Sequence, residues 1–242
     1  AGFRAFRGGG RARRLESGSS RISAGPSFRM SGVKTRRELI PGPAGRIECA
    51  IDMPPGQVRG LALVAHPHPL YGGTLDNKVV QTLAHALAGL GYLALRPNFR
   101  GVGASEGAYD EGRGERDDLL ATLEYARGEF GAFHPVAAPV LAGFSFGAAV
   151  QTHVAGHLSA KSAAPGRMLL VGVAVRHFDA RPVPRDSIVI HGEKDETVLL
   201  ADVLDWARGQ ELPVVVVPGA DHFFHRRLHV LRSIVTANWR AP

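Results

Sequence analysis

Cysteine is almost absent from this chain: of its 242 residues, only Cys49 carries a thiol. A single cysteine cannot form a disulfide within the chain or build a zinc centre from several thiolates, so both kinds of stabilised small domain are excluded. Long apolar runs are missing as well. The longest uncharged stretch, residues 131–160, is interrupted by serine, threonine, histidine and glycine, and we expect no membrane span.

Outside the first residues, the chain has almost no excess of charge of one sign. Residues 1–29 contain seven arginines and one acid, Glu16, and they carry most of the net charge of +7. The remaining chain has 22 basic and 21 acidic residues. A nearly neutral body offers no broad positive surface to a phosphate backbone, so we expect no nucleic-acid partner.

The first 29 residues are rich in arginine, glycine and serine, a composition that favours a flexible segment. The segment lacks the apolar core of a secretory signal. Three interpretations stay open: a leader or added extension ahead of Met30, a mitochondrial-type transit peptide, or a nucleic-acid-binding arm. We expect the folded domain to comprise residues 30–242 and the protein to be cytoplasmic, with organellar import if the segment is a transit peptide.

Short apolar runs typical of strands alternate with amphipathic helical patterns along the rest of the chain. The expected strands are Ile47–Asp52, Leu61–His66, Tyr92–Pro97, Pro139–Gly143, Met168–Val175, Ser187–His191 and Pro213–Val217. Helical stripes begin near Val79, Leu119, Leu199 and Leu228, the first of them capped by Asp76. This alternation predicts an α/β fold with one mostly parallel sheet, helices on both faces, and the first two strands as an antiparallel edge.

The connection between the fifth and sixth expected strands bears on access to any site above the sheet. Arg176–Asp186 is eleven residues long, contains two prolines and has no helical apolar stripe. Such a segment is too short to form a helical cap, so we expect no cap domain and an open site.

A serine between two glycines follows the fourth expected strand, in the segment Gly143-Phe144-Ser145-Phe146-Gly147. Gly-x-Ser-x-Gly between a strand and a helix is typical of the nucleophile elbow, a turn so sharp that side chains at the glycine positions would collide with neighbouring backbone. Ser145 is therefore the candidate nucleophile. Short patterns of this kind also occur by chance in strand-to-helix loops.

A serine nucleophile needs a base and an acid that orients the base, and both are present later in the chain. Asp195 follows the sixth expected strand, with Glu193 and Glu196 as nearby alternatives. His222 follows the seventh, with His225 as its rival, although we expect His225 to begin the last helix. The carboxyl ends of parallel strands meet at one edge of a sheet, so these side chains can converge there.

Several longer segments carry a family resemblance. HPHPLYGG (66–73), NFRGVGASEG (98–107), GFSFG (143–147), HGEKDETV (191–198) and GADHFF (219–224) resemble the α/β-hydrolase superfamily, and within it a group of small, lidless bacterial serine hydrolases. The resemblance extends from about Val33 to Trp239. It implies an esterase-like enzyme with Ser145 as nucleophile, Asp195 as acid and His222 as base.

The same resemblance implies an oxyanion hole made of two backbone N–H groups. One is expected from Phe146, directly after the nucleophile. The other is expected from the HPHPLYGG loop, in which Pro67 and Pro69 have no N–H to donate. His68 is the first choice and Leu70 the second. We expect the substrate pocket to be walled by Leu70, Tyr71, Phe144 and Phe223.

Two pairs of histidines have the spacing of metal ligands, but neither predicts a metal site. His66 and His68 have no carboxylate nearby in the sequence, and His153 and His157 share a helical face without the glutamate of a zinc-protease helix. We therefore expect neither a metal nor a cofactor.

The expected reaction is hydrolysis of small carboxylic esters through an acyl-serine intermediate. Thioesters and small amides share this chemistry, with different leaving groups. The alternative is a hydrolase-like fold that serves as a non-catalytic binding or scaffold module, whose mark would be a broken triad. The expected partner is a small-molecule ester, and the oligomeric state, including a homodimer, is left open.

Overall fold

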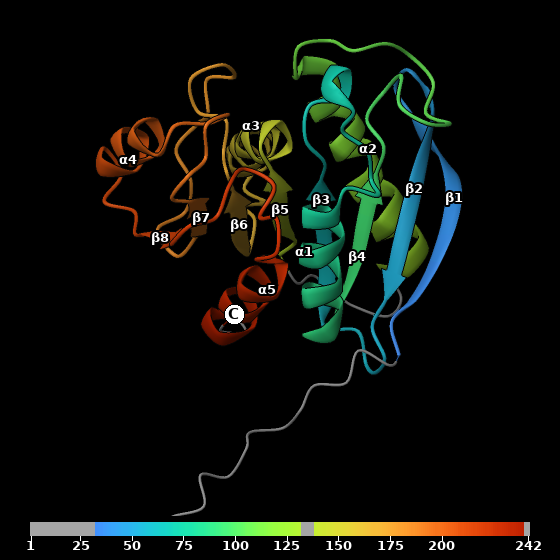
Figure 1. The fold of residues 1–242 in the computed structure, drawn as a ribbon. Coiled ribbons are helices and arrows are strands. Elements are labelled where there is room, and N and C mark those ends of the chain that lie inside the picture. The colour runs from blue at the N-terminus through green and yellow to red at the C-terminus, as the bar shows by residue number, and fades with distance from the viewer. Residues whose placement is uncertain (1–31, 132–137, 240–242) are drawn as a thin grey trace, which may run out of the picture. The chain divides into compact units, whose positions relative to one another are not determined.

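The computed structural model describes residues 32–131 and 138–239, so the predicted segment 1–29 and the predicted domain start at residue 30 lie outside the described residues. Its sheet has eight strands in the order β1-β2-β4-β3-β5-β6-β7-β8 (Figure 1). The strands are β1 (Lys34–Gly42), β2 (Gly45–Met53), β3 (Gly60–Ala65), β4 (Tyr92–Pro97), β5 (Val140–Phe144), β6 (Arg167–Val171), β7 (Ile188–Gly192) and β8 (Val214–Val217). From β4 to β8 in this order, all neighbouring strands are parallel.

The antiparallel edge is not formed by the two strands expected there. β2 pairs antiparallel with β1 on one side and with β4 on the other, whereas β3 lies between β4 and β5 and is parallel to both. The prediction that the segment Leu61–His66 belongs to the edge is therefore wrong. The error arose because β1 is a mostly exposed, charge-rich strand with no apolar run to mark it.

Helices cover both faces of the sheet, as predicted. They are α1 (Lys78–Gly89), α2 (Arg113–Phe130), α3 (Phe146–Ala160), α4 (Leu200–Arg208) and α5 (Leu228–Asn238), with a short 3₁₀ helix η1 (Pro69–Tyr71). Apolar residues of α1 and α5 pack on one face, and those of α2, α3 and α4 on the other. Within β3, Leu63 packs on the face covered by α2, α3 and α4, and Val64 packs on the face covered by α1 and α5, because successive strand residues point to opposite faces. Both faces of the central strands are thus buried.

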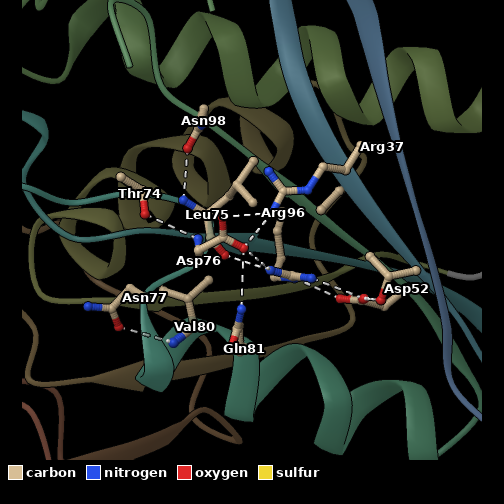
Figure 2. Close-up of polar contacts among 12 residues, drawn as sticks. Arg37, Asp52, Thr74, Leu75, Asp76, Asn77, Val80, Gln81, Arg96 and Asn98 are labelled. Carbon is tan, nitrogen blue, oxygen red and sulfur yellow. Dashed lines mark hydrogen bonds and ion pairs between the residues drawn. The ribbon is translucent and has the colours of Figure 1, made fainter. Parts of the chain in front are cut away.

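The N-cap of the first helix lies one residue later than expected. Asn77, not Asp76, is the N-cap of α1, and its side-chain oxygen accepts hydrogen bonds from the N–H groups of Val79 and Val80. Asp76 instead pairs with Arg37, which lies on β1 (Figure 2). Asp76 Oδ1 also lies 3.9 Å from Arg96 Nη1, so Asp76 contributes to the polar network that holds the loop before α1.

In residues 32–131 and 138–239, no separate cap covers the carboxyl ends of the parallel strands. Residues 172–187, which connect β6 to β7, contain no helix and no strand, so the predicted absence of a cap domain is confirmed. In the described part of the chain, no helix has both the length and the apolar character needed to cross a membrane.

Candidate active site

Ser145 occupies the sharp turn between β5 and α3, with a φ of 55° and a ψ of −118°. A non-glycine residue at such a φ is strained, and this strain is a recurring property of functional turns. The flanking glycines are required by close packing. A Cβ at Gly143 would lie 2.6 Å from the Ala148 nitrogen, and a Cβ at Gly147 would overlap the His66 carbonyl oxygen. The local geometry is therefore that of a nucleophile elbow.

The structure brings Ser145, His222 and Asp195 together in one hydrogen-bonded chain. His222 Nε2 lies 3.1 Å from Ser145 Oγ, and His222 Nδ1 lies 2.7 Å from Asp195 Oδ2. Because a carboxylate can only accept, Nδ1 carries the proton and Nε2 is free to accept the serine hydroxyl proton. All three side chains are largely buried, which shields their hydrogen bonds from water.

The loop after β7 fixes the orientation of Asp195. Its second oxygen, Oδ1, accepts hydrogen bonds from the N–H groups of Thr197 at 3.0 Å and Val198 at 2.8 Å. The alternative acid, Glu193, is committed elsewhere, since its carboxylate accepts the N–H of Gly219 at 2.7 Å. Of the neighbouring carboxylates considered from the sequence, Asp195 is the one hydrogen-bonded to His222.

His225, the rival base, is exposed and points to a different partner. Its Nδ1 lies 2.7 Å from Asp221 Oδ2, and its backbone N–H also donates to that carboxylate. Although partial burial raises the pKa of Asp221, these hydrogen bonds outweigh it and hold the pKa below its usual value. His225 does not begin the last helix as expected, because α5 starts at Leu228.

A second histidine, which the sequence argument passed over, lies beside the acid. His191 is fully buried at the end of β7, and its Nε2 donates to the Val198 carbonyl oxygen at 2.9 Å. The same nitrogen lies 3.5 Å from Asp195 Oδ2. Burial lowers the pKa of His191 and so favours its neutral form, which leaves the charge of Asp195 available to His222. Its position in the motif HGEKD, directly before Gly192, was the signal available in the sequence.

The loop between β3 and α1 distinguishes the two expected oxyanion donors. The Leu70 N–H donates to His68 Nδ1 at 3.2 Å, so it is already used within the loop. The N–H groups of Tyr71 and Gly73 both donate to the His68 carbonyl oxygen. Within the described residues, the N–H of His68 has no hydrogen-bond partner, and neither does that of Phe146 at the start of α3. The geometry therefore favours His68 over Leu70.

Buried polar side chains anchor the far end of this loop at Leu75 (Figure 2). The Leu75 N–H donates to Asn98 Oδ1 at 2.8 Å, and the Leu75 carbonyl accepts from Arg96 Nη1 at 2.6 Å. Arg96 also donates to Asp52 through two nitrogens. Burial raises the pKa of Asp52, but hydrogen bonds from His85 and Arg96 more than compensate and hold it below its usual range. The loop end is thus tied to β2 and β4 through a buried ion pair.

The four expected pocket walls differ in their exposure. Leu70 and Tyr71 are exposed and Phe223 is half-exposed, so all three can border an open site. Phe144 has no exposed surface, and its prediction as an accessible wall is wrong. Its position on a buried strand sends the ring beneath His222, with 4.7 Å between ring centroids, where it supports the imidazole.

Aromatic side chains gather around the His68 ring. The centroids of Tyr109, Phe146 and Phe178 lie 4.9, 4.9 and 5.6 Å from it. Beyond Tyr109 and Phe178 lies a cavity of about 560 Å³, also lined by His153. The His153 Nε2 hydrogen-bonds to the Phe178 carbonyl at 2.9 Å. Sequence reasoning missed Tyr109 and Phe178 because both lie in loops with no motif of their own.

No group of three or more metal-ligating side chains is found in the described part of the chain. Both ring nitrogens of His66 are hydrogen-bonded to backbone groups, one to the Phe99 N–H and one to the Pro67 carbonyl. The His66 ring therefore has no free nitrogen for a metal. Cys49 is fully buried, and burial raises the pKa of its thiol, which keeps it protonated and unreactive.

Comparison with known proteins gives consistent matches over most of the chain. No family model matches. The uncharacterized protein RP471 of Rickettsia prowazekii (strain Madrid E) is 34% identical over 197 residues, which is 76% of this chain and 79% of that protein.

Two solved structures are closely similar. XC6422 from Xanthomonas campestris, described as an α/β serine hydrolase without a lid, is 36% identical with a TM-score of 0.76, covering 85% of this chain and 93% of its own. An α-β serine hydrolase homologue from Coxiella burnetii is 38% identical, also with a TM-score of 0.76, and the match covers 85% of this chain and 97% of that one. Fold and sequence similarity therefore extend together across the described domain.

Proposed function

This chain belongs to the α/β-hydrolase superfamily, and we propose that it is a serine hydrolase that cleaves small carboxylic esters through an acyl-serine intermediate. The observation that carries the proposal is the hydrogen-bonded chain from Ser145 Oγ through His222 to Asp195, at 3.1 and 2.7 Å. The two serine hydrolase relatives above 35% identity support the same chemistry.

The first half of the proposed reaction acylates the enzyme. Ser145 Oγ attacks the ester carbonyl carbon while its proton passes to His222 Nε2. The carbonyl oxygen becomes an oxyanion, which the N–H groups of Phe146 and His68 stabilise. When the intermediate collapses, the bond to the leaving oxygen breaks, and His222 returns the proton to the departing alcohol. Asp195 holds the imidazole in the tautomer that this transfer requires.

The second half releases the acid. A water molecule gives a proton to His222 Nε2 and attacks the acyl carbon from the side that the alcohol has left. Collapse of the second oxyanion breaks the bond to Ser145 Oγ, which takes the proton back from His222. The products are one carboxylic acid and one alcohol, with the enzyme unchanged.

The lack of a cap supports small substrates. An open site walled by exposed residues such as Tyr71 and Leu70 buries only a few methylenes, and each buried methylene contributes about 0.8 kcal/mol. Long acyl chains therefore gain little from binding. Thioesters and small amides fit the same steps, with a sulfur or nitrogen leaving group.

The test is hydrolysis of p-nitrophenyl esters of increasing acyl length, with a matched thioester and anilide. We expect measurable kcat/KM for the esters, highest for short acyl chains, and a loss of roughly 10⁴–10⁶ in the Ser145→Ala variant. The melting temperature of Ser145→Ala, measured by thermal unfolding, should show that this variant is folded. Undiminished hydrolysis by Ser145→Ala would overturn the mechanism, and a steady rise of kcat/KM to long chains would overturn the small-substrate assignment.

A further inference from the structure

His66 follows β3 directly, and its ring is completely buried beside the elbow. Its Nε2 accepts the N–H of Phe99 at 2.9 Å. Since a backbone N–H can only donate, Nε2 carries no hydrogen, and the neutral ring must carry its proton on Nδ1. That Nδ1–H donates to the Pro67 carbonyl oxygen at 2.7 Å. The Phe99 contact thus selects the tautomer that can hold Pro67.

The Pro67 carbonyl shares a peptide plane with the proposed oxyanion donor. The bond between Pro67 and His68 is trans, so the Pro67 C=O and the His68 N–H are rigidly coupled and point in opposite directions. Fixing one group therefore fixes the other. The His66 ring holds the plane by its carbonyl side and leaves the N–H side unpaired.

Gly73 closes on the same carbonyl from another part of the loop. A Cβ at Gly73 would overlap the Pro67 carbonyl oxygen, and the Gly73 N–H donates to the His68 carbonyl at 3.0 Å. The elbow packs against this segment too, because a Cβ at Gly147 would overlap the His66 carbonyl oxygen. The peptide between residues 67 and 68 is therefore confined by the loop and set at a fixed position relative to the helix that follows Ser145.

We propose that His66 is a positioning residue, whose Nδ1–H holds the Pro67–His68 peptide with the His68 N–H directed at the oxyanion. This inference rests on the proposed function, since it assigns a role within the same reaction. A donor that is fixed in advance stabilises the oxyanion without reorganisation during the reaction. Burial lowers the pKa of His66 to about 4, so the ring stays neutral when the enzyme works near neutral pH.

Two substitutions separate the two hydrogen bonds of this ring. An asparagine amide reaches the position of Nδ1, so His66→Asn keeps a donor for the Pro67 carbonyl and loses the acceptor for Phe99. A glutamine carbonyl reaches the position of Nε2, so His66→Gln keeps that acceptor and loses the donor. Each variant loses one hydrogen bond and some ring packing, and their effects on stability should be similar.

The measurement is kcat and KM for a short p-nitrophenyl ester, together with Ki for a trifluoromethyl ketone, which forms a tetrahedral oxyanion adduct with the serine. We expect His66→Gln to lose about 10²–10³ in kcat and a similar factor in Ki, while His66→Asn stays within about tenfold of the wild type and KM changes little in either. Val235→Ala, a cavity variant on the buried side of α5, serves as the control for lost stability alone.

The outcomes separate the two claims. If the wild type hydrolyses none of the esters, the proposed function fails. If the wild type is active and both His66 variants lose equal activity, the positioning role is refuted. It is also refuted if the loss of kcat simply follows the loss of melting temperature, as judged by comparison with Val235→Ala. Should either variant fail to fold, nitrogen NMR of the wild-type histidines gives the decision. We expect Nδ1 of His66 to be protonated and Nε2 to be unprotonated. The opposite tautomer would refute the proposal.

Discussion

The proposed catalytic triad and the proposed oxyanion loop lie side by side but are built on different principles. In the triad, the working groups are side chains that three loops bring to the carboxyl ends of β5, β7 and β8. In the loop between β3 and α1, the proposed working group is a backbone N–H, and buried side chains hold that backbone. His66 anchors the start of the loop, while Arg96 and Asn98 anchor its end at Leu75.

The difference shows where each kind of site is vulnerable. A side chain that reacts is removed completely by one substitution. A backbone donor survives almost every substitution of its own residue, because all residues except proline have the N–H. Its precision depends instead on buried neighbours that never touch the substrate. Substitutions of particular residues can therefore test this difference, and we expect their effects on kcat and on stability to differ in size.

Among the residues that assist Ser145, the largest effect is expected at the acid. Asp195→Asn should lower kcat by about 10⁴, because an amide cannot hold the imidazole in the tautomer that accepts the serine proton. The same ester assay measures it, with the melting temperature as a check that the loop after β7 is intact.

Glu193→Gln and Glu196→Gln are the matched controls for this prediction. Both change one carboxylate in the same loop, and Glu193→Gln also weakens the contact to Gly219. We expect less than about tenfold loss in either, since neither carboxylate is hydrogen-bonded to His222. A larger loss in Glu193→Gln than in Asp195→Asn would transfer the role of the acid to Glu193.

A smaller effect is expected when the loop loses its backbone donor. His68 has a φ of −53°, which proline also adopts, so His68→Pro removes the N–H at a φ that suits proline. His68→Ala removes the same imidazole and keeps the N–H. The proline variant should have a kcat lower than that of the alanine variant by about 10²–10³. Equal kcat values in the two variants would show that the second donor is elsewhere in the loop.

The smallest effect concerns acid stability. The pKa of His66 is about 4 in the folded protein, below the value near 6.5 of a free side chain, so the unfolded chain binds a proton that the folded protein excludes. Stability from this residue is present above about pH 6.5 and is lost as pH falls towards about 4, an effect of up to about 3 kcal/mol. Urea unfolding of His66→Asn should therefore depend less on pH in this window. An identical dependence in wild type and variant would contradict the buried neutral ring.

The sequence predicted well that Ser145, Asp195 and His222 come together, because each follows a strand and belongs to a recognisable motif. Ser145 needs its two glycines for steric reasons, and Asp195 and His222 come in the order that the fold requires. The parallel sheet was predictable for a similar reason, since strands buried on both faces are continuously apolar. The exposed strand β1 carried no such pattern and was missed as an edge.

The oxyanion loop could be predicted only in outline. Prolines at positions 67 and 69 excluded two donors, but the choice between His68 and Leu70 depends on a hydrogen bond from the Leu70 N–H to the His68 ring. The cluster of Tyr109 and Phe178 around that ring joins segments far apart in the chain. Such contacts form only when the whole domain packs, so no local sequence pattern predicts them.

The central claim, that Ser145 is an activated nucleophile, is tested most directly by a fluorophosphonate probe that reacts with such serines. Intact mass and peptide mapping should show one probe per chain, attached to the peptide that contains Ser145. Ser145→Ala and heat-unfolded wild type should take up none, because the reaction needs both the hydroxyl and its folded surroundings. An absence of labelling in the folded wild type, or undiminished labelling of Ser145→Ala, would contradict the account.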